Sequence, residues 1–240
     1  MRLPRVLRRA EEVMEEALRC EVLLGRGIWA TFLLQGSQGP PLAVLKVVSP
    51  RRARLAAKVN DPNPFFANET PSERLVRERE TLRSLAPHGL VPSLLDAGEN
   101  YLLMAHVSGP SLAERRGASK EELIEIVIRI VEALGRIHEL GFTHGDARPD
   151  NIILADRGPV FIDFEHLIGP HSPADEQRAL DWLRFFHHIQ HFRGDLFDGD
   201  AGLLLEQIYQ TVDADDLKRL PILSNQLQWV VPPTLLNSLE

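Results

Sequence analysis

The sequence predicts an α+β fold in two parts, a sheet-rich N-terminal part and a helical C-terminal part. Short runs of β-branched and apolar residues fill much of residues 21–48, as is typical of a sheet of short strands. After residue 119 the apolar residues recur at helical spacing instead. A chain of 240 residues is long enough to build two small lobes that share a cleft. We therefore expect an N-terminal lobe of residues 1–105 and a C-terminal lobe of residues 106–240.

The composition is that of an ordinary globular protein, with 44% hydrophobic and 25% charged residues. The formal net charge of -7 argues against a general nucleic-acid-binding role, which would need a basic surface. The single cysteine, Cys20, excludes an internal disulfide framework. No apolar run approaches the roughly 20 residues that span a bilayer, and the basic N-terminus lacks a signal peptide's apolar core. We therefore expect a cytoplasmic protein without a transmembrane segment.

The first elements are a helix and three strands. Residues 8–18 are rich in strong helix formers and predict an N-terminal helix. Residues 21–24 and 31–34 predict two strands that flank a glycine-containing turn. Residues 42–48 predict a third strand, which is apolar around a single lysine, Lys46. This part of the chain therefore predicts a short helix followed by the strands of a small sheet.

A proline-rich loop, a charged helix and two more strands complete the N-terminal lobe. Prolines and asparagines in residues 61–71 break all periodicity and indicate a loop. Residues 72–85 then predict a helix whose leucines keep to one side. Residues 91–95 and 101–104 predict short strands, and residues 96–100 between them predict a hairpin-like turn.

The character of the sequence changes to helices after a hinge near residues 105–110. Ser119 and Glu122 have the spacing of a capping box, which marks the start of a helix. The helix that follows is predicted to be strongly amphipathic, because its apolar residues share one face: Leu123, Ile126, Val127, Ile130, Val131, Leu134 and Ile137.

The strongest chemical signal is the segment His144-Gly145-Asp146-Ala147-Arg148-Pro149-Asp150-Asn151. Asp146 can accept or orient the proton of an attacking hydroxyl group. Asn151 can offer its amide oxygen to Mg²⁺, which prefers hard oxygen ligands. The guanidinium group of Arg148 matches the geometry of phosphate oxygens. His144 is predicted to pack and hydrogen-bond in the core. Together these residues predict ATP-dependent phosphoryl transfer.

Asp163 and Lys46 strengthen this prediction. Asp163 ends an apolar run, which places its carboxylate at a strand terminus where it would bind the metal ion. Lys46 lies within an apolar strand, and its ammonium group needs polar partners because burial of an unpaired charge is costly. Phosphate oxygens and a carboxylate would serve. Glu78 is the preferred carboxylate, with Glu80 and Glu73 as alternatives.

The turn between the first two strands carries Gly25 and Gly27, and glycines there allow backbone amides to approach phosphates. Ala30 stands where a third glycine would be expected. Taken alone this loop is weak evidence, but it fits a nucleotide-binding role when combined with the lysine strand and the Asp146 loop.

From residue 23 to residue 186 the chain resembles the protein-kinase-like superfamily. The resemblance implies that Gly25, Gly27 and Lys46 bind the phosphates of ATP, and that Glu78, the glutamate of the adjoining helix, completes the nucleotide site by pairing with Lys46. Residues 101–109 (YLLMAHVSG) resemble the kinase hinge, which makes Met104 the gatekeeper and gives the backbones of Ala105 and Val107 to the adenine. Asp181 would be the helix aspartate that braces the catalytic loop from beneath.

Departures from the usual kinase pattern indicate a branch of the superfamily. His-Gly-Asp replaces His-Arg-Asp, Glu165 replaces the glycine of Asp-Phe-Gly, and the chain between Asp163 and Trp182 is too short for a long activation segment. The chain therefore resembles the compact atypical kinases, namely the RIO family, the KEOPS-complex kinase and the bacterial lipopolysaccharide-core kinases. Aminoglycoside phosphotransferases share the His-Gly-Asp pattern and remain an alternative.

The resemblance implies a bilobal enzyme that moves the γ-phosphoryl group of ATP, with Mg²⁺, to a hydroxyl group. The acceptor is either a protein serine or threonine or a sugar of the lipopolysaccharide type, and a protein partner is compatible with the pattern. Arg148 and Arg157 are the only cationic candidates that the sequence indicates near Asp146. A RIO- or KEOPS-like ATPase and a nucleotide-binding pseudokinase are the other interpretations. His187 and His191 share a helix face at a zinc-like spacing, but without an obvious third ligand a packed helix is preferred.

Overall fold

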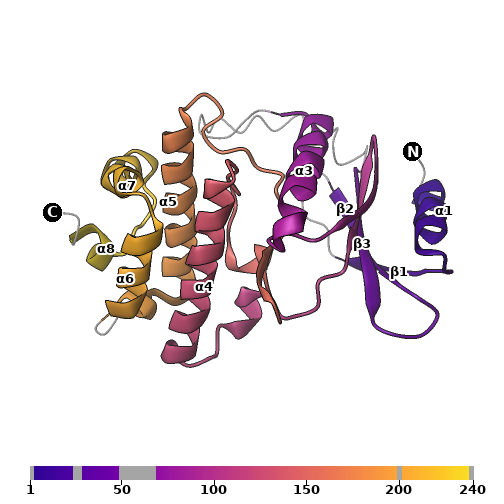
Figure 1. Cartoon of the computed structure of the whole chain (residues 1–240), viewed down its shortest axis with the longest axis horizontal. Helices are drawn as coiled ribbons and strands as arrows, with labels where there is room; N and C mark the ends of the chain where they lie inside the picture. Colours follow the sequence, from indigo (N-terminus) through magenta and orange to yellow (C-terminus); the bar gives the residue numbers. More distant parts are fainter. Residues whose placement is uncertain (1–2, 24–28, 49–68, 199–201, 238–240) are drawn as a thin grey trace. The chain divides into compact units, whose positions relative to one another are not determined.

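A computed structural model of the chain describes residues 3–23, 29–48, 69–198 and 202–237. Contacts between Cα atoms divide it into two compact units. Among the described residues the first unit extends through Val107 and the second begins at Ser108. The first unit holds an antiparallel sheet and the second is mostly helical (Figure 1), so the predicted α+β class is confirmed.

The first unit is built on a five-stranded antiparallel sheet. Its strands are β1 (Arg19–Leu23), β2 (Trp29–Gln35), β3 (Pro41–Val48), β4 (Leu94–Gly98) and β5 (Tyr101–Ala105), in the spatial order β1-β2-β3-β5-β4. Lys46 lies opposite Leu102 in the ladder between β3 and β5. The strand that carries the lysine is therefore central in the sheet and has neighbours on both sides.

Helix α1 (Leu3–Met14) covers part of this sheet, as Figure 1 shows. The sequence predicts this helix over residues 8–18, so it begins and ends earlier than expected. Val6 and Ala10 are buried on its inner face and belong to the same apolar cluster as Leu34, Leu45 and Leu103. Burial of this apolar stripe stabilises a helix that would be marginal alone.

Strand β4 differs from its predicted position. The sequence predicts a strand over residues 91–95 and a turn over residues 96–100, but β4 runs from Leu94 to Gly98 and only two residues form the turn. Asp96 can lie in a strand because its carboxylate accepts hydrogen bonds from Tyr101 Oη at 2.8 Å and from Arg9 Nε at 2.9 Å. Those partners are supplied by tertiary structure and are not visible in the local pattern.

Helix α3 (Pro71–Leu85) follows a capping box, since Thr70 Oγ1 accepts from the amide of Glu73 and the Glu73 carboxylate accepts from the amide of Thr70. The predicted helix of residues 72–85 is thus confirmed within one residue. A short 3-10 helix, η1 (Ala86–His88), leads from α3 toward β4. Leu75, Leu82 and Leu85 are buried on the same side of α3 as Glu78.

The second unit contains the long helices α4 (Lys120–Glu139) and α5 (Ala174–Arg193), a two-stranded sheet and a group of C-terminal helices. The sheet pairs β6 (Ile152–Ala155) with β7 (Gly158–Phe161). Three 3-10 helices lie before or after these elements: η2 (Leu112–Arg115), η3 (Pro149–Asn151) and η4 (Gly194–Phe197). The C-terminal helices are α6 (Gly202–Thr211), α7 (Ala214–Leu227) and α8 (Pro233–Asn237).

Helix α4 is amphipathic as predicted, and the seven apolar residues predicted to share one face are all wholly or partly buried. Ser119 caps the helix by accepting a hydrogen bond from the amide of Glu122 at 3.1 Å. The predicted capping box is only half formed, because the Glu122 carboxylate pairs with Arg115. Helix α5 packs beside α4, where the ring of Trp182 lies edge-on to His138 with 4.9 Å between centroids.

Candidate functional site

The hairpin of β6 and β7 brings two predicted metal ligands to neighbouring positions of the backbone. Asn151 precedes β6 directly, and Asp163 follows β7 after one intervening residue. The amide of Ile162 donates to the carbonyl oxygen of Asn151 at 3.0 Å, which extends the ladder past the end of the hairpin. The eleven residues between Asn151 and Asp163 thus fold back on themselves.

His144 ties the Asp146 loop to the end of this hairpin. Its Nδ1 accepts a hydrogen bond from the amide of Asp146 at 3.1 Å, so its Nε2 carries the proton and donates to the carbonyl of Ile162 at 3.0 Å. The ring packs against Phe161 and Phe164 and is fully buried. Burial lowers the pKa of His144. The imidazole is therefore neutral and structural, as the sequence predicts.

Asp181, on α5, braces the loop that carries Asp146, as the resemblance to kinases implies. Its carboxylate accepts from the amides of His144 at 2.7 Å and Gly145 at 2.8 Å and contacts His138 Nε2 at 2.9 Å. Burial alone would raise the pKa of Asp181, but the His138 hydrogen bond and the nearby His144 hold it below its usual value. A buried carboxylate with this many donors fixes the backbone of the loop.

Gly145 lies where the loop passes against the backbone of His166. Its φ is +75°, and a Cβ atom at this position would stand 2.2 Å from the carbonyl oxygen of His166. A side chain would therefore be both strained and sterically excluded. This explains in physical terms why glycine occupies the position before Asp146.

The carboxylate of Asp146 is 4% exposed and is held from two sides. Its Oδ2 lies 3.4 Å from Asn151 Nδ2 and 3.6 Å from Arg148 Nε. Its Oδ1 accepts from Arg184 Nη2 at 2.7 Å and lies 3.6 Å from His188 Nε2. Burial alone would raise the pKa of Asp146, but the neighbouring His188 and the positive charge of Arg184 depress it far below the usual range. Asp146 is thus ionised and its orientation is fixed.

The oxygen atoms of Asn151 and Asp163 fit a magnesium ion. Asn151 Nδ2 donates to the backbone carbonyl of Asp146 at 3.0 Å, so the side-chain oxygen of Asn151 is the atom presented to a ligand. Asp163 has a φ of 71°, a left-handed conformation that is uncommon outside glycine and is concentrated at functional sites. One amide oxygen and one carboxylate leave most of the octahedral positions of Mg²⁺ for water and phosphate oxygens, as this ion prefers.

In the first unit Lys46 and Glu78 form the expected ion pair. Lys46 Nζ donates to Glu78 Oε2 at 2.7 Å, and the two residues are 5% and 1% exposed. The ammonium group also lies 4.7 Å from the centroid of the Trp29 ring. The two alternative partners are occupied elsewhere, because Glu73 caps α3 and Glu80 pairs with the arginines on either side of it.

The other predicted nucleotide-binding residues lie at the end of β5 or outside the described chain. Met104 is 8% exposed and pairs with Val44 and Leu94 in the sheet. The amide of Ala105 donates to the carbonyl of Ser93 at 2.9 Å, so its carbonyl is the group that an adenine could use. Val107 is the last residue of the first unit. The glycine loop with Gly25 and Gly27 lies outside the described residues.

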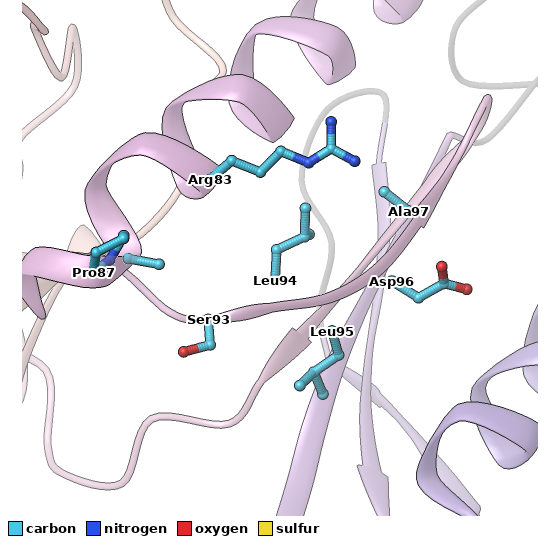
Figure 2. Close-up of a pocket in the computed structure, with 8 residues that line it drawn as sticks. Arg83, Pro87, Ser93, Leu94, Leu95, Asp96 and Ala97 are labelled. Carbon is cyan, nitrogen blue, oxygen red and sulfur yellow. The ribbon is translucent and has the colours of Figure 1, made fainter.

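A cavity of about 510 Å³ lies in the first unit, between the end of α3 and β4. Figure 2 shows Arg83 reaching over the face of β4 that bears Leu94 and Ala97, while Leu95 and Asp96 lie on the opposite face. Ala86, Pro87 and Ser93 complete its lining. None of these eight residues is a predicted site residue, so the cavity is separate from the predicted chemistry.

The structure adds basic side chains near Asp146 that the sequence reasoning missed. Arg184 and His188 follow Asp181 at spacings of three and seven on α5, so all three share one face of the helix. That spacing is the feature of the sequence from which their position near Asp146 could have been inferred. Arg157, which the sequence indicates as a nearby cation, lies in the turn between β6 and β7, at the far end of the hairpin from Asn151. Arg157 is therefore not near Asp146, contrary to the expectation from the sequence.

The histidines of α5 do not form a metal centre. The amide of Val230 donates to His187 Nδ1 at 3.0 Å, and His191 Nδ1 lies 2.8 Å from the carbonyl oxygen of His187. Within the described ranges no group of three or more His, Cys, Asp or Glu is placed to hold a metal ion. In the same part of the chain no helix has the length and apolar character needed to cross a membrane.

The chain is similar in sequence to known protein kinases. A model of the RIO domain family matches residues 67–183. The RIO-type serine/threonine-protein kinase Rio2 of Methanocaldococcus jannaschii is 31% identical over 104 residues, which are 42% of this chain and 38% of Rio2. Serine/threonine-protein kinase D of Synechocystis is 31% identical over 147 residues, or 58% of this chain and 27% of the relative. The chain thus spans less than half the length of either relative.

The fold has a counterpart among solved structures. The kinase domain of PknI from Mycobacterium tuberculosis, solved as its C20A mutant, is 20% identical, with a TM-score of 0.51 over 82% of this chain and 89% of that domain. The likeness concerns the fold alone. The RIO-domain match, the similarity to Rio2 and the His-Gly-Asp loop make the chain similar to the compact atypical branch of the protein-kinase-like superfamily, which includes the RIO kinases.

Proposed function

We propose that this protein is an ATP- and Mg²⁺-dependent phosphotransferase that moves the γ-phosphoryl group of ATP to a hydroxyl group. The observation that carries the proposal is the arrangement around Asp146, which joins an ionised carboxylate to the side chain of Asn151 at 3.4 Å. Asn151 in turn lies at the same end of the hairpin as Asp163. A carboxylate base beside two oxygen ligands for a cation is the smallest set of protein groups expected for phosphoryl transfer.

In the proposed reaction the acceptor's hydroxyl oxygen attacks the γ-phosphorus of ATP. The new oxygen–phosphorus bond forms while the bond to the β–γ bridging oxygen breaks, and ADP leaves with that electron pair. Asp146 orients the hydroxyl group and accepts its proton, which then passes to solvent. A low pKa makes Asp146 a weak base, so we assign it mainly the task of orienting the acceptor, which suits a loose transition state.

The remaining predicted residues hold the nucleotide in this proposal. Asn151 and Asp163 would bind Mg²⁺, which when present neutralises the charge that develops on the phosphate oxygens. Lys46, oriented by Glu78, would contact phosphate oxygens of ATP, and Arg148 would contact the phosphoryl group in transfer. The backbones of Ala105 and Val107 beside Met104 would receive the adenine, and Gly25 and Gly27 would cover the phosphates.

The surroundings of Asp146 bear on the class of acceptor. Arg148 and Arg184 both face its carboxylate, and His188 lies on the same side as Arg184. These contacts neutralise the Asp146 carboxylate, which would otherwise attract a polycationic acceptor such as an aminoglycoside. The same surroundings place no restriction on water as the acceptor, so ATP hydrolysis is measured alongside transfer in the test below.

The test is transfer of label from γ-³²P-ATP by the full chain, with and without Mg²⁺, to protein, sugar and aminoglycoside acceptors and to water. We expect Mg²⁺-dependent turnover that is lost in Asp146→Asn and kept in Asp150→Asn. Asp150 is an exposed carboxylate of the same loop, so its variant controls for a general change of charge. Bound nucleotide without turnover in the wild type would instead identify a pseudokinase, and absence of Mg²⁺-dependent nucleotide binding would refute both interpretations.

A further inference from the structure

The Asp146 carboxylate is held unequally at its two oxygens. Oδ1 accepts from Arg184 Nη2 at 2.7 Å, the distance of a charge-assisted hydrogen bond. The contacts of Oδ2 are longer, 3.4 Å to Asn151 Nδ2 and 3.6 Å to Arg148 Nε. A carboxylate offers about two acceptor positions on each oxygen. Oδ2 therefore keeps the capacity to accept a hydrogen bond from a hydroxyl group, on the side of the proposed metal ligand.

The hydrogen bond between Arg184 and Asp146 is shielded from water. The two side chains are 16% and 5% exposed, and Nε and Nη1 of Arg184 are buried from solvent. A hydrogen bond between charged groups is stronger where water does not compete for the donor and the acceptor. This contact therefore fixes the orientation of the carboxylate more firmly than an ion pair at the surface would.

The segment between α7 and α8 holds Arg184 in turn. The guanidinium carbon of Arg184 lies 5.7 Å from the centroid of the Trp229 ring, within the range of a cation–π contact. The Trp229 ring is stacked on His187, with 5.8 Å between centroids. Ser224 Oγ donates to the carbonyl oxygen of Trp229 at 2.6 Å, and the amide of Val230 donates to His187 Nδ1 at 3.0 Å. Trp229 is thus fixed on both sides and limits where the guanidinium group can move.

We propose that Arg184 is a positioning residue that fixes Oδ1 of Asp146, commits Oδ2 to the acceptor's hydroxyl group, and is itself held in place by Trp229. This assignment deepens the proposed function and rests on it for the role of Asp146. The match to the RIO domain ends at residue 183, so Arg184 and Trp229 both lie beyond it. Neither residue is assigned to ATP or to the metal ion. The C-terminal segment therefore acts on the reaction through Arg184.

The role of Arg184 is tested by the rate of Mg²⁺-dependent γ-phosphoryl transfer. Arg184→Met keeps the aliphatic stem and removes the donors, so kcat should fall about tenfold or more while the KM for ATP stays unchanged. Arg184→Lys restores a charged donor and should keep more of the rate. Arg136→Gln removes an exposed arginine of α4 and should leave the rate unchanged. The stoichiometry of ATP binding with Mg²⁺ gives the folded fraction of each variant, which corrects kcat for misfolded protein.

Trp229 is tested alone and together with Arg184. Trp229→Ala leaves Arg184 in the chain without its ring contact, and kcat should fall about threefold or more, whereas Trp229→Phe keeps an aromatic ring and most of the rate. In the Arg184→Met background Trp229→Ala should cause no further loss, because Trp229 acts through Arg184. A general loosening of the C-terminal helices would lower kcat by the same factor in both backgrounds. If Arg184→Met fails to fold, Arg184→Lys takes its place in this comparison.

The contact between Arg184 and Asp146 is tested without any reaction. The Tm is measured for the wild type, Arg184→Met, Asp146→Asn and the double variant. Because the two side chains share one hydrogen bond, the loss of Tm in the double variant should be smaller than the sum of the two single losses, by about 2 °C or more. This comparison does not depend on the substrate or on the activity.

Each failure has its own signature. Wild-type kcat in Arg184→Met, or a change confined to the KM for the acceptor, would overturn the positioning role of Arg184. Equal loss of kcat from Trp229→Ala in both backgrounds would overturn the role of Trp229. Additive losses of Tm would overturn the direct contact. Absence of transfer and hydrolysis by the wild type, together with non-additive losses of Tm, would refute the proposed function and leave the contact between Arg184 and Asp146 standing.

Discussion

At the scale of single residues, the pairing of Lys46 with Glu78 could be predicted from the sequence because burial of an unpaired charge is costly. A lysine in an apolar strand must place its ammonium group against a carboxylate, and Glu78 lies on the buried side of a helix with leucines at compatible spacing. The position of Arg184 against Asp146 could not be predicted in the same way. The two residues are 38 positions apart, and only the path of α5 past the loop brings them together.

The buried pair makes a prediction about stability. Glu78→Gln removes the carboxylate that accepts from the buried Lys46 ammonium group, and loss of one partner of a buried pair costs about 3 kcal/mol of unfolding free energy. Urea denaturation measures the loss. Glu80→Gln is the control, because the side chain of Glu80 is 54% exposed and its pairs are at the surface, so less than about 0.5 kcal/mol should be lost. Equal effects of the two substitutions would contradict the account.

His187 makes a prediction about pH. Burial and the neighbouring His191 and His188 lower the pKa of His187 to about 4 from 6.5. Between these values the unfolded chain binds more protons than the folded chain at this position. The stabilising contribution of neutral His187 is therefore complete above pH 6.5 and declines as the pH falls toward about 4.

Ring resonances of His187 followed by NMR across this pH range test the prediction. We expect a midpoint near 4 and loss of the Val230 amide hydrogen bond as the ring is protonated. His191→Gln should move the midpoint upward, because it removes a neighbouring group that lowers the pKa. A midpoint at 6.5 in the wild type would show that the described packing around His187 is wrong.

At the scale of elements, the hairpin of β6 and β7 and the loop before it hold the site together. The strands and their termini were predictable, because an apolar run that ends in Asp163 indicates a strand end. The displacement of β4 was not predictable, because Asp96 depends on Arg9 and Tyr101 for its hydrogen bonds. Local pattern therefore predicts elements well where their polar groups are satisfied locally, and less well where distant residues supply the partners.

Gly145 tests the fit of the loop to the neighbouring backbone. Gly145→Ala forces a Cβ to within 2.2 Å of the His166 carbonyl oxygen at a φ of +75°, so the loop must move. Gly141→Ala is the control, since its φ of +84° imposes the same backbone strain with no atom within 4 Å. Gly141→Ala should cost about 1 kcal/mol in thermal denaturation and Gly145→Ala clearly more. If the two variants are equally stable, the close approach at His166 is not present in solution.

At the scale of the whole molecule, the sequence indicates a kinase-like chain because each unit contains its own kinase-like sequence motif. The lysine strand and α3 lie in the first unit, and the Asp146 loop with its hairpin lies in the second. The RIO-domain match extends from residue 67 to residue 183 and leaves α1 and the helices after α5 outside. The sequence predicts the N-terminal helix but says little about the helices after α5, and the structure shows how these outer elements attach: Val6 and Ala10 join the core of the sheet, and Trp229 stacks on His187.

The most direct test of phosphoryl transfer by this chain is a comparison of binding and turnover in Asp146→Asn. Asp146 lies beside Asn151 but is not itself assigned to the metal or to ATP. The stabilisation by ATP with Mg²⁺ should therefore match the wild type, while the rate of γ-phosphoryl release or transfer falls by about a hundredfold or more. A variant that binds ATP with Mg²⁺ and turns it over at the wild-type rate would contradict the account.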